Sequence, residues 1–397
     1  MKKDKLFLSL LMIFSLISYG SFACRYTVRE IGFSEIGSKY YHLFFLTNSH
    51  TQEEQVLTIN KFSNLLLRDS NIRLELINVD EKGSSSGLEY ITRHNIQTFP
   101  SVVFVAPDGE SIRCPYTMAG QSLSASSWFL METLATSTFR EDLIRKLIQS
   151  YGVVLIIEGA DDAETIRVKN DAREAIKKIA GSLNQMPKVV NKPPEIMVIP
   201  RSKIDDEKIL LFGLGITEKN KDDTHVAILY GRGRLAGPVL TGEQINTRRI
   251  CNLLTFVGAD CECGIDNSWI IGEMIPLRWG PSEQAELIEQ LGFDVENPFV
   301  KTEMSQIISM KPSVMNPINP LEENLLEFME TSFEIENGTD AVPRITAAEI
   351  QKSLLGKSKR SNLVLTKTLV SLGSVFLVIV MIGLYIFLLN KRRAKRK

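Results

Sequence analysis

Two stretches of the chain share one order of apolar and polar segments. In the first, apolar runs at Tyr41–Leu46, at Asn71–Asp80 and directly after Pro100 predict buried strands. Between the first two runs, one face of an amphipathic helix is predicted by apolar residues at helical spacing: Val56, Ile59, Phe62 and Leu66. A closing helix over residues 122–136 completes the order βαβαββα.

The second stretch repeats this order from residue 153 to residue 257. Its expected elements are the strand Val153–Ile157, the helix Thr165–Leu183, the strand Glu195–Ile199, the apolar segment Lys208–Ile216, the hairpin of His225–Tyr230 and Leu235–Leu240, and the helix Glu243–Val257. The helix Phe139–Ser150 connects the two stretches. Strands that alternate with helices in this way predict an α/β fold, built here as two tandem units.

The segment Asn71–Gly109 combines several features in a fixed order. A strand ends in Asn-x-Asp, a short helical segment follows, and a Phe99–Pro100 bond precedes a strand that closes on a Pro-Asp-Gly turn. This arrangement resembles the middle of a thioredoxin domain. The resemblance implies a cis-proline at Pro100, because only proline brings the cis form close in energy to trans.

A thioredoxin also carries Cys-x-x-Cys just after its first long strand. In this chain the segment at that place is Thr47–Gln52, and its sequence TNSHTQ contains no cysteine. The first unit, about residues 40–136, therefore resembles a thioredoxin without its catalytic thiol pair. The second unit has neither the pair nor a proline before its hairpin strand, so there the resemblance rests on the order of elements.

The two ends of the chain are predicted to carry targeting and membrane-anchoring segments. Basic residues, twelve mostly apolar residues and the small residues of Ser21–Ala23 predict a signal peptide over 1–23. The segment Thr368–Leu389 has 22 residues without a charge, and this length is enough to cross a bilayer. Six basic residues follow it. We therefore expect a single-pass protein with the lipid bilayer contacting residues 367–390. A lipid on Cys24 would be redundant beside this helix.

Charge separates the exported part from its ends. The net charge of −1 includes +6 from the basic tail and +2 from the start of the signal, which leaves −9 for the residues between. An acidic exported part argues against a nucleic-acid partner, which a basic face would bind. The predicted divisions are a signal peptide (1–23), thioredoxin-like domain 1 (24–136), a connecting helix (137–150), thioredoxin-like domain 2 (151–264), an ordered extension (265–300), a flexible stalk (301–366), a transmembrane helix (367–390) and a basic cytoplasmic tail (391–397).

Three of the five cysteines lie close together, at Cys251, Cys261 and Cys263. A structural disulfide from Cys251 to one of the other two is the first interpretation, because export permits such bridges. The second is a thiol pair that exchanges electrons or binds a soft metal ion. The acidic neighbours Asp260 and Glu262 oppose this second use, because they raise a thiol pKa. Cys114 is expected to be a buried apolar residue.

Arginines gather near the second hairpin, at Arg232, Arg234, Arg248 and Arg249. A solvated hairpin tip and helix face is the simpler interpretation, and a site for an anion or an acidic partner is the alternative. His50 is the one titratable side chain near the place of the missing thiol pair. The Gly-Ser loop 83–87 matches a hydrolase motif only in form, since no catalytic partner is visible.

The leading hypothesis is a non-catalytic exported protein that binds or scaffolds another envelope protein and uses no cofactor or metal. The alternative is a thiol-disulfide oxidoreductase or soft-metal-handling protein that uses Cys251, Cys261 and Cys263. The expected location is the cell membrane, with an extracytoplasmic ectodomain and a cytoplasmic C-terminus. The endoplasmic reticulum membrane is the alternative location.

Overall fold

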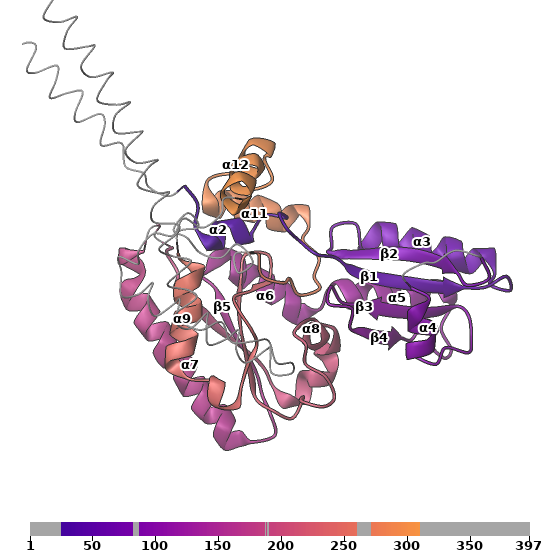
Figure 1. Ribbon diagram of the computed structural model, residues 1–397, viewed down its shortest axis with the longest axis horizontal. Coiled ribbons are helices and arrows are strands. Elements are labelled where there is room, and N and C mark those ends of the chain that lie inside the picture. Colours follow the sequence, from indigo (N-terminus) through magenta and orange to yellow (C-terminus); the bar gives the residue numbers. More distant parts are fainter. Residues whose placement is uncertain (1–24, 82–86, 187, 189, 260–270, 310–397) are drawn as a thin grey trace, which may run out of the picture. The chain divides into compact units, whose positions relative to one another are not determined.

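The computed structural model describes residues 25–81, 87–186, 188, 190–259 and 271–309 (Figure 1). These residues all belong to the first of the two compact units into which the chain divides, Met1–Ser332. Two β-sheets, each flanked by helices, form the framework of this part of the chain.

The first sheet has four strands in the order β2-β1-β3-β4. They are β1 (Tyr41–Thr47), β2 (Ile72–Asn78), β3 (Ser101–Val105) and β4 (Ser111–Cys114). Strand β1 pairs parallel with β2 and antiparallel with β3, and β3 pairs antiparallel with β4. The accompanying helices are α3 (Glu53–Leu66), α4 (Glu89–Arg93) and α5 (Leu123–Ala135).

Alternation along β1 sends its side chains into two separate cores. Leu43 and Phe45 join the core beneath α3 and α5, and Phe44 and Leu46 join the core beneath α4. All four side chains are almost fully buried, and burial of such a side chain contributes about 1.5–3 kcal/mol. The unbroken apolar run in the sequence is therefore that of a central strand covered on both faces.

The second sheet has the order β6-β5-β7-β8, with β9 paired to the other end of β7. Its strands are β5 (Val153–Ile157), β6 (Glu195–Ile199), β7 (His225–Tyr230), β8 (Arg234–Leu235) and β9 (Leu240–Thr241). Its helices are α6 (Thr138–Gln149), α7 (Asp162–Ser182), α8 (Lys208–Gly213) and α9 (Thr247–Val257), with short 3-10 turns at Leu183–Gln185, Arg201–Glu207 and Gly242–Gln244. Strand β5 pairs parallel with β6 and antiparallel with β7.

Both sheets therefore have the thioredoxin-like topology. In each, the central strand pairs parallel with the next strand in sequence and antiparallel with a hairpin strand. The Phe99–Pro100 peptide bond is cis. The second hairpin strand follows Thr224 and has no proline there, as the sequence shows. The α/β prediction is confirmed, and the order of elements in the weaker second unit was sufficient to find it.

The first described residues pack away from the first sheet. Helix α2 (Val28–Gly32) places Val28 and Ile31 in the core of the second sheet, together with Phe33. The Arg29 guanidinium group donates hydrogen bonds to the carbonyls of Leu147, Ile148 and Ser150 at the end of α6. The sequence assigns this segment to domain 1, and its packing places it instead with the second sheet.

Two helices follow the second sheet, α11 (Pro281–Leu291) and α12 (Pro298–Ser309). The stalk was expected to begin at residue 301, and this is wrong for residues 301–309, which lie in α12. Met304 is fully buried and joins the core of the second sheet. The high polar content of the segment hid an apolar pair one turn apart, Met304 and Ile308, which fixes the helix to that core.

The segment 273–279 joins residues of both sheets. The Asn71 side chain donates to the carbonyl of Ile275 and accepts from the backbone N–H of Leu277, at 2.9 and 3.0 Å. On the other side, the backbone N–H of Ile275 donates to the carbonyl of Gly233. This segment lies within the predicted ordered extension. Its backbone hydrogen bonds connect residues of the first sheet with residues of the second.

None of the helices in the described ranges is long and apolar enough to span a membrane. The predicted signal peptide, most of the stalk, the transmembrane helix at 367–390 and the basic tail lie outside the described residues. These remain predictions.

Candidate functional site

The place of the missing thiol pair is a loop of polar residues between β1 and α3. The backbone N–H of Ser49 donates to the Asp80 carboxylate at 2.7 Å, and the Asn48 side chain accepts from the N–H of His50. The hydrogen bonds from Ser49 hold the pKa of Asp80 below its ordinary value, with a smaller contribution from His50. The loop is therefore held by hydrogen bonds and contains no thiol nucleophile.

The cis-proline lies at the same edge of the first sheet as this loop. Leu46 pairs with Ser101, which directly follows Pro100, so the end of β1 and the start of β3 lie side by side. Pro100 is half-buried. The thioredoxin arrangement of loop and cis-proline is thus complete except for its cysteines.

The equivalent edge of the second sheet is closed by its own chain. The backbone N–H of Ala160 donates to the carbonyl of Asp222 at 2.7 Å, and the N–H of Gly159 donates to the Thr224 hydroxyl. A Cβ atom on Gly159 would lie 2.6 Å from backbone atoms of the same segment. The segment 222–224 thus packs directly against this edge, and the residues Glu158–Asp161 contain no cysteine.

The described cysteines lie away from both edges. Cys114 is buried in β4, as predicted, and burial raises its pKa to about 12. Cys251 is half-buried on α9, and burial, together with Glu174, raises its pKa against the opposing effect of Lys178. No disulfide joins these two described thiols. Cys24, Cys261 and Cys263 lie outside the described residues, so the predicted thiol cluster is untested.

Two of the candidate anion-binding arginines are buried. Arg234 is 1% exposed and donates to the carbonyls of Gly32, Ser34, Ile36 and Gly272 and to the Ser38 hydroxyl. Arg232 is 6% exposed, pairs with Glu35 and Glu296, and lies over the Trp279 ring. The solvated hairpin tip is therefore wrong for both. Their guanidinium groups are used within the chain, whereas the prediction for Arg248 and Arg249 is untested.

Buried arginines that the sequence did not single out close the ends of helices. Arg140 donates to the carbonyls of Thr133, Leu134 and Thr136 at the end of α5, and to the carbonyl of Pro276. Arg29 does the same at the end of α6. The last carbonyls of a helix have no partner within it, and a cation near them is stabilised by the helix dipole. The partners of Arg29 are about 120 residues away in sequence, whereas Arg140 bonds mainly to the preceding helix end, four to seven residues before it.

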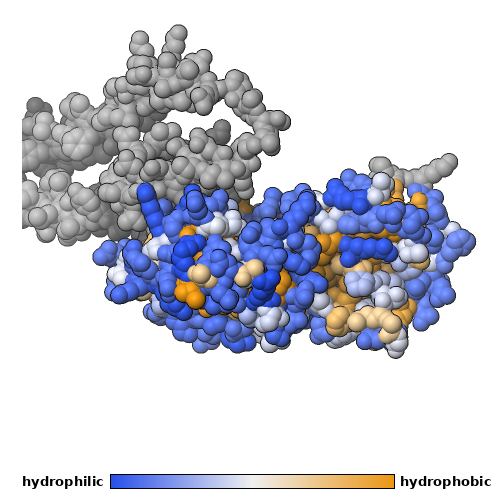
Figure 2. Space-filling view, turned by 90° about the horizontal axis from the view of Figure 1, so that it is seen from below, coloured by the Kyte–Doolittle hydropathy of each residue, from blue (hydrophilic) through white to orange (hydrophobic). Residues whose placement is uncertain are grey.

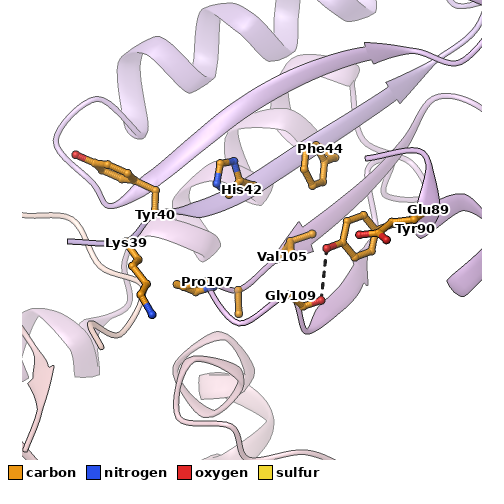
Figure 3. A pocket seen from close by; sticks show the side chains of 10 residues that line it. Lys39, Tyr40, His42, Phe44, Glu89, Tyr90, Val105, Pro107 and Gly109 are labelled. Carbon is orange, nitrogen blue, oxygen red and sulfur yellow. Dashed lines mark hydrogen bonds between the residues drawn. The ribbon is translucent and has the colours of Figure 1, made fainter. Parts of the chain in front are cut away.

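A surface pocket of about 330 Å³ opens on the α4 side of the first sheet (Figure 3). Three rings line it in a row, with His42 stacked on Phe44 at 5.9 Å between centroids and Phe44 stacked on Tyr90 at 5.6 Å. The remaining lining residues are Lys39, Tyr40, Glu89, Val105, Ala106, Pro107 and Gly109. The pocket has an apolar floor and a polar rim, which is the usual composition of a binding site.

His42 also contacts the neighbouring strand. Its Nδ1 atom lies 2.5 Å from the Glu75 carboxylate, and its side chain is 41% exposed. His94 contacts the Ser111 hydroxyl and His225 contacts the carbonyl of Asn220, so both have structural partners. The described residues contain no cluster of histidine, cysteine and carboxylate side chains that would hold a metal ion.

Apolar residues gather over the first sheet on the face shown in Figure 2. Elsewhere on the surface, large apolar side chains of the helices α3 and α5 are exposed, namely Leu57 and Leu65 on α3 and Trp128 and Phe129 on α5. Exposed apolar area of this kind is typical of surfaces that bind other proteins.

No protein-family model and no curated protein matches the chain. Among solved structures, the chain is similar to the first two thioredoxin domains of Saccharomyces cerevisiae Eps1p, at 10% identity over 57% of this chain and 94% of that one, with a TM-score of 0.21. It is also similar to zinc-bound human ERp44, at 10% identity over 66% of this chain and 63% of that one, with a TM-score of 0.21.

A third similar structure is the bb fragment of ERp72, at 12% identity over 54% of this chain and 86% of that one, with a TM-score of 0.19. With TM-scores this low, the thioredoxin-like assignment rests on the strand order, pairing and cis-proline of the chain itself.

Proposed function

We propose that this thioredoxin-like protein is exported, anchored in the cell membrane, and binds or scaffolds another envelope protein without thiol chemistry. One observation carries the proposal: neither Thr47–Gln52 nor Glu158–Asp161, the two places where such a fold carries its thiols, contains a cysteine. Thiol exchange needs a nucleophilic thiolate and a resolving thiol within reach of each other. The hydrogen-bonded loop and the closed second edge offer neither.

The half-buried thiol on α9 supports the same proposal. Burial raises the pKa of Cys251, so little thiolate is present at neutral pH. A catalytic thiol has the opposite shift. The alternative, an oxidoreductase or metal-handling protein, depends on Cys261 and Cys263 together with this residue.

Insulin reduction by the full-length protein in lipid nanodiscs tests the catalytic half of the proposal. We expect no rate above that of the reductant alone, and no change in a Cys251→Ser variant. A rate typical of dedicated oxidoreductases, lost in the Cys251→Ser or Cys261→Ser variant, would overturn it. The Cys114→Ser variant is the matched control, because that thiol is buried in a strand.

Anchoring and binding are tested in native membranes. We expect the full-length protein to resist extraction at high pH and a variant without residues 367–390 to be released. Crosslinking in intact cells, followed by purification of the full-length protein, should recover one envelope protein in a fixed ratio. Recovery of no partner, with the protein intact in the membrane, would contradict the binding role.

A further inference from the structure

The two sheets are covered differently. On the second sheet, α7 and α9 pack together on one face, and α6 and α8 lie on the other (Figure 1). On the first sheet, α3 and α5 pack together on one face, and the described chain covers the other with the five-residue helix α4. Helices α3, α4 and α5 correspond in order to α7, α8 and α9. The first sheet therefore has no described counterpart of α6.

The course of the N-terminal segment explains this difference. Helix α6 directly precedes the central strand β5 and packs against it. The segment that directly precedes β1 contains α2, which packs in the core of the second sheet instead. The first sheet thus lacks a helix where the second has one.

Strand pairing identifies the equivalent positions. Leu46 and Ile157 each pair with the first residue of the hairpin strand, Ser101 and His225. Counting back along each strand, the second sheet's counterparts of His42 and Phe44 are Val153 and Leu155. Val153 is fully buried, whereas the His42 side chain is 41% exposed. The same position is covered on one sheet and open on the other, and the pocket lies at the open one.

Charge at the pocket favours a basic occupant. The rim and turn carry three carboxylates, those of Glu89, Asp108 and Glu110, and none of them forms a salt bridge with a described residue. The nearby cation Lys39 is paired with Glu273 at 3.2 Å. Two further cations lie over rings that line the pocket, Arg73 over Tyr40 and Arg93 over Tyr90. The three carboxylates outnumber these two guanidinium groups, so the net charge around the pocket is negative.

We propose that the pocket belongs to a docking site for a basic amphipathic helix of the partner protein, which takes the place that α6 takes on the second sheet. This inference rests on the proposed binding function. Helix α6 shows the chemistry required, since it buries two leucines one turn apart, Leu143 and Leu147. An incoming helix inserts one such side chain against the rings of His42, Phe44 and Tyr90, and its lysines or arginines face the three carboxylates.

Two synthetic helices test the proposal with the full-length protein in zwitterionic nanodiscs. One consists of leucine and lysine in an amphipathic pattern, and the other has glutamate in place of every lysine. Each carries a benzophenone at one apolar position, so that mass spectrometry identifies the protein residues that it contacts. We expect the basic helix to bind and to crosslink to residues 39–44, 89–90 and 105–109, and the acidic helix not to bind.

Two matched double charge reversals distinguish binding at the pocket from nonspecific electrostatic attraction to the protein surface. Glu89→Lys with Asp108→Lys should weaken binding of the basic helix about tenfold or more. Glu53→Lys with Glu54→Lys, on the opposite face of the sheet, should leave it unchanged. Equal weakening by both pairs, or crosslinks outside the pocket, would overturn the proposal. Binding that requires deletion of residues 310–366 would overturn it too, because the chain's own segment would then be the occupant. Insulin reduction in the same preparation reports on the proposed function separately.

Discussion

At the scale of single residues, buried arginines join separate elements of the described fold through hydrogen bonds to backbone carbonyls. Burial lowers the pKa of Arg29 and of Arg140 to about 10, with carboxylates opposing the shift, so both are cations at neutral pH. Each places its charge among carbonyl groups that a helix end leaves without partners. Removal of such a side chain leaves several buried acceptors unsatisfied at once.

Replacement of Arg140 by methionine should therefore be costly. Arg140→Met keeps most of the apolar stem but leaves four carbonyls without this donor, and it leaves the buried Glu207 carboxylate, 3.9 Å away, without its cationic neighbour. We expect a loss of about 3–5 kcal/mol in the free energy of unfolding, measured by urea denaturation. Arg145→Met, which breaks an exposed pair with Asp142 on the same helix, should change it by less than about 1 kcal/mol. Similar losses in the two variants would contradict a larger contribution of the buried Arg140 hydrogen bonds to stability.

The pH dependence of alkylation tests the environment of Cys251. Its pKa is raised, so the thiolate fraction at a given pH is smaller than in an unfolded chain and grows only at higher pH. After reduction, the rate of iodoacetamide labelling should reach half its maximum above about pH 8.5, the usual value for a cysteine. Peptide mapping of the same protein in guanidinium provides the reference curve. A native curve at lower pH than the reference would contradict the burial of this thiol.

At the scale of elements, the sequence predicted most strands and long helices. Strands β5 and β6 have the predicted bounds, and α5 and α6 differ from theirs by one residue at each end. These elements are marked by periodicity, which the sequence displays directly. The Arg232 and Arg234 predictions failed because glycines on both sides suggest an exposed turn, whereas α2 and the segment 273–279 cover it. That cover comes from residues about forty to two hundred positions away.

For two glycines of the second unit, substitution by alanine is expected to change the stability of the fold in opposite directions. Gly159→Ala places a Cβ 2.6 Å from the backbone of Asp222 and Thr224, and should destabilise the fold by about 1–3 kcal/mol. Gly181→Ala lies near the end of α7 with no atom within 4 Å of the new Cβ, and should stabilise it by about 0.5–1 kcal/mol. Thermal denaturation of both variants provides the measurement. Similar shifts in the two variants would mean that the loop at 222–224 does not close this edge.

At the scale of the whole molecule, the sequence predicted the two tandem thioredoxin-like units but not how the chain is shared between them. The absence of the thiol pair is a matter of residue identity and could be read directly. The pocket could not, because it depends on which face of the first sheet lacks a helix. That depends in turn on α2, whose apolar residues Val28 and Ile31 indicate burial but not which sheet buries them.

Deletion of residues 25–33 tests whether α2 packs on the second sheet or on the first. Loss of α2 should expose apolar side chains of the second sheet and leave the first sheet covered as before. Hydrogen–deuterium exchange of the full-length variant should therefore accelerate in β5 and β7, and remain unchanged in β1 and β3. Acceleration in the first sheet alone would place this segment with the sheet that follows it in sequence.

The position of α2 also has a consequence for biosynthesis. A chain synthesised from its N-terminus presents Arg25–Phe33 early, yet Arg29 bonds to carbonyls as far as 121 residues later, and Arg25 pairs with Glu303 on α12. These residues thus remain without all of their neighbours until the chain has been synthesised as far as α12. Such late closure slows folding, and it leaves this short apolar segment exposed to holding chaperones in the meantime.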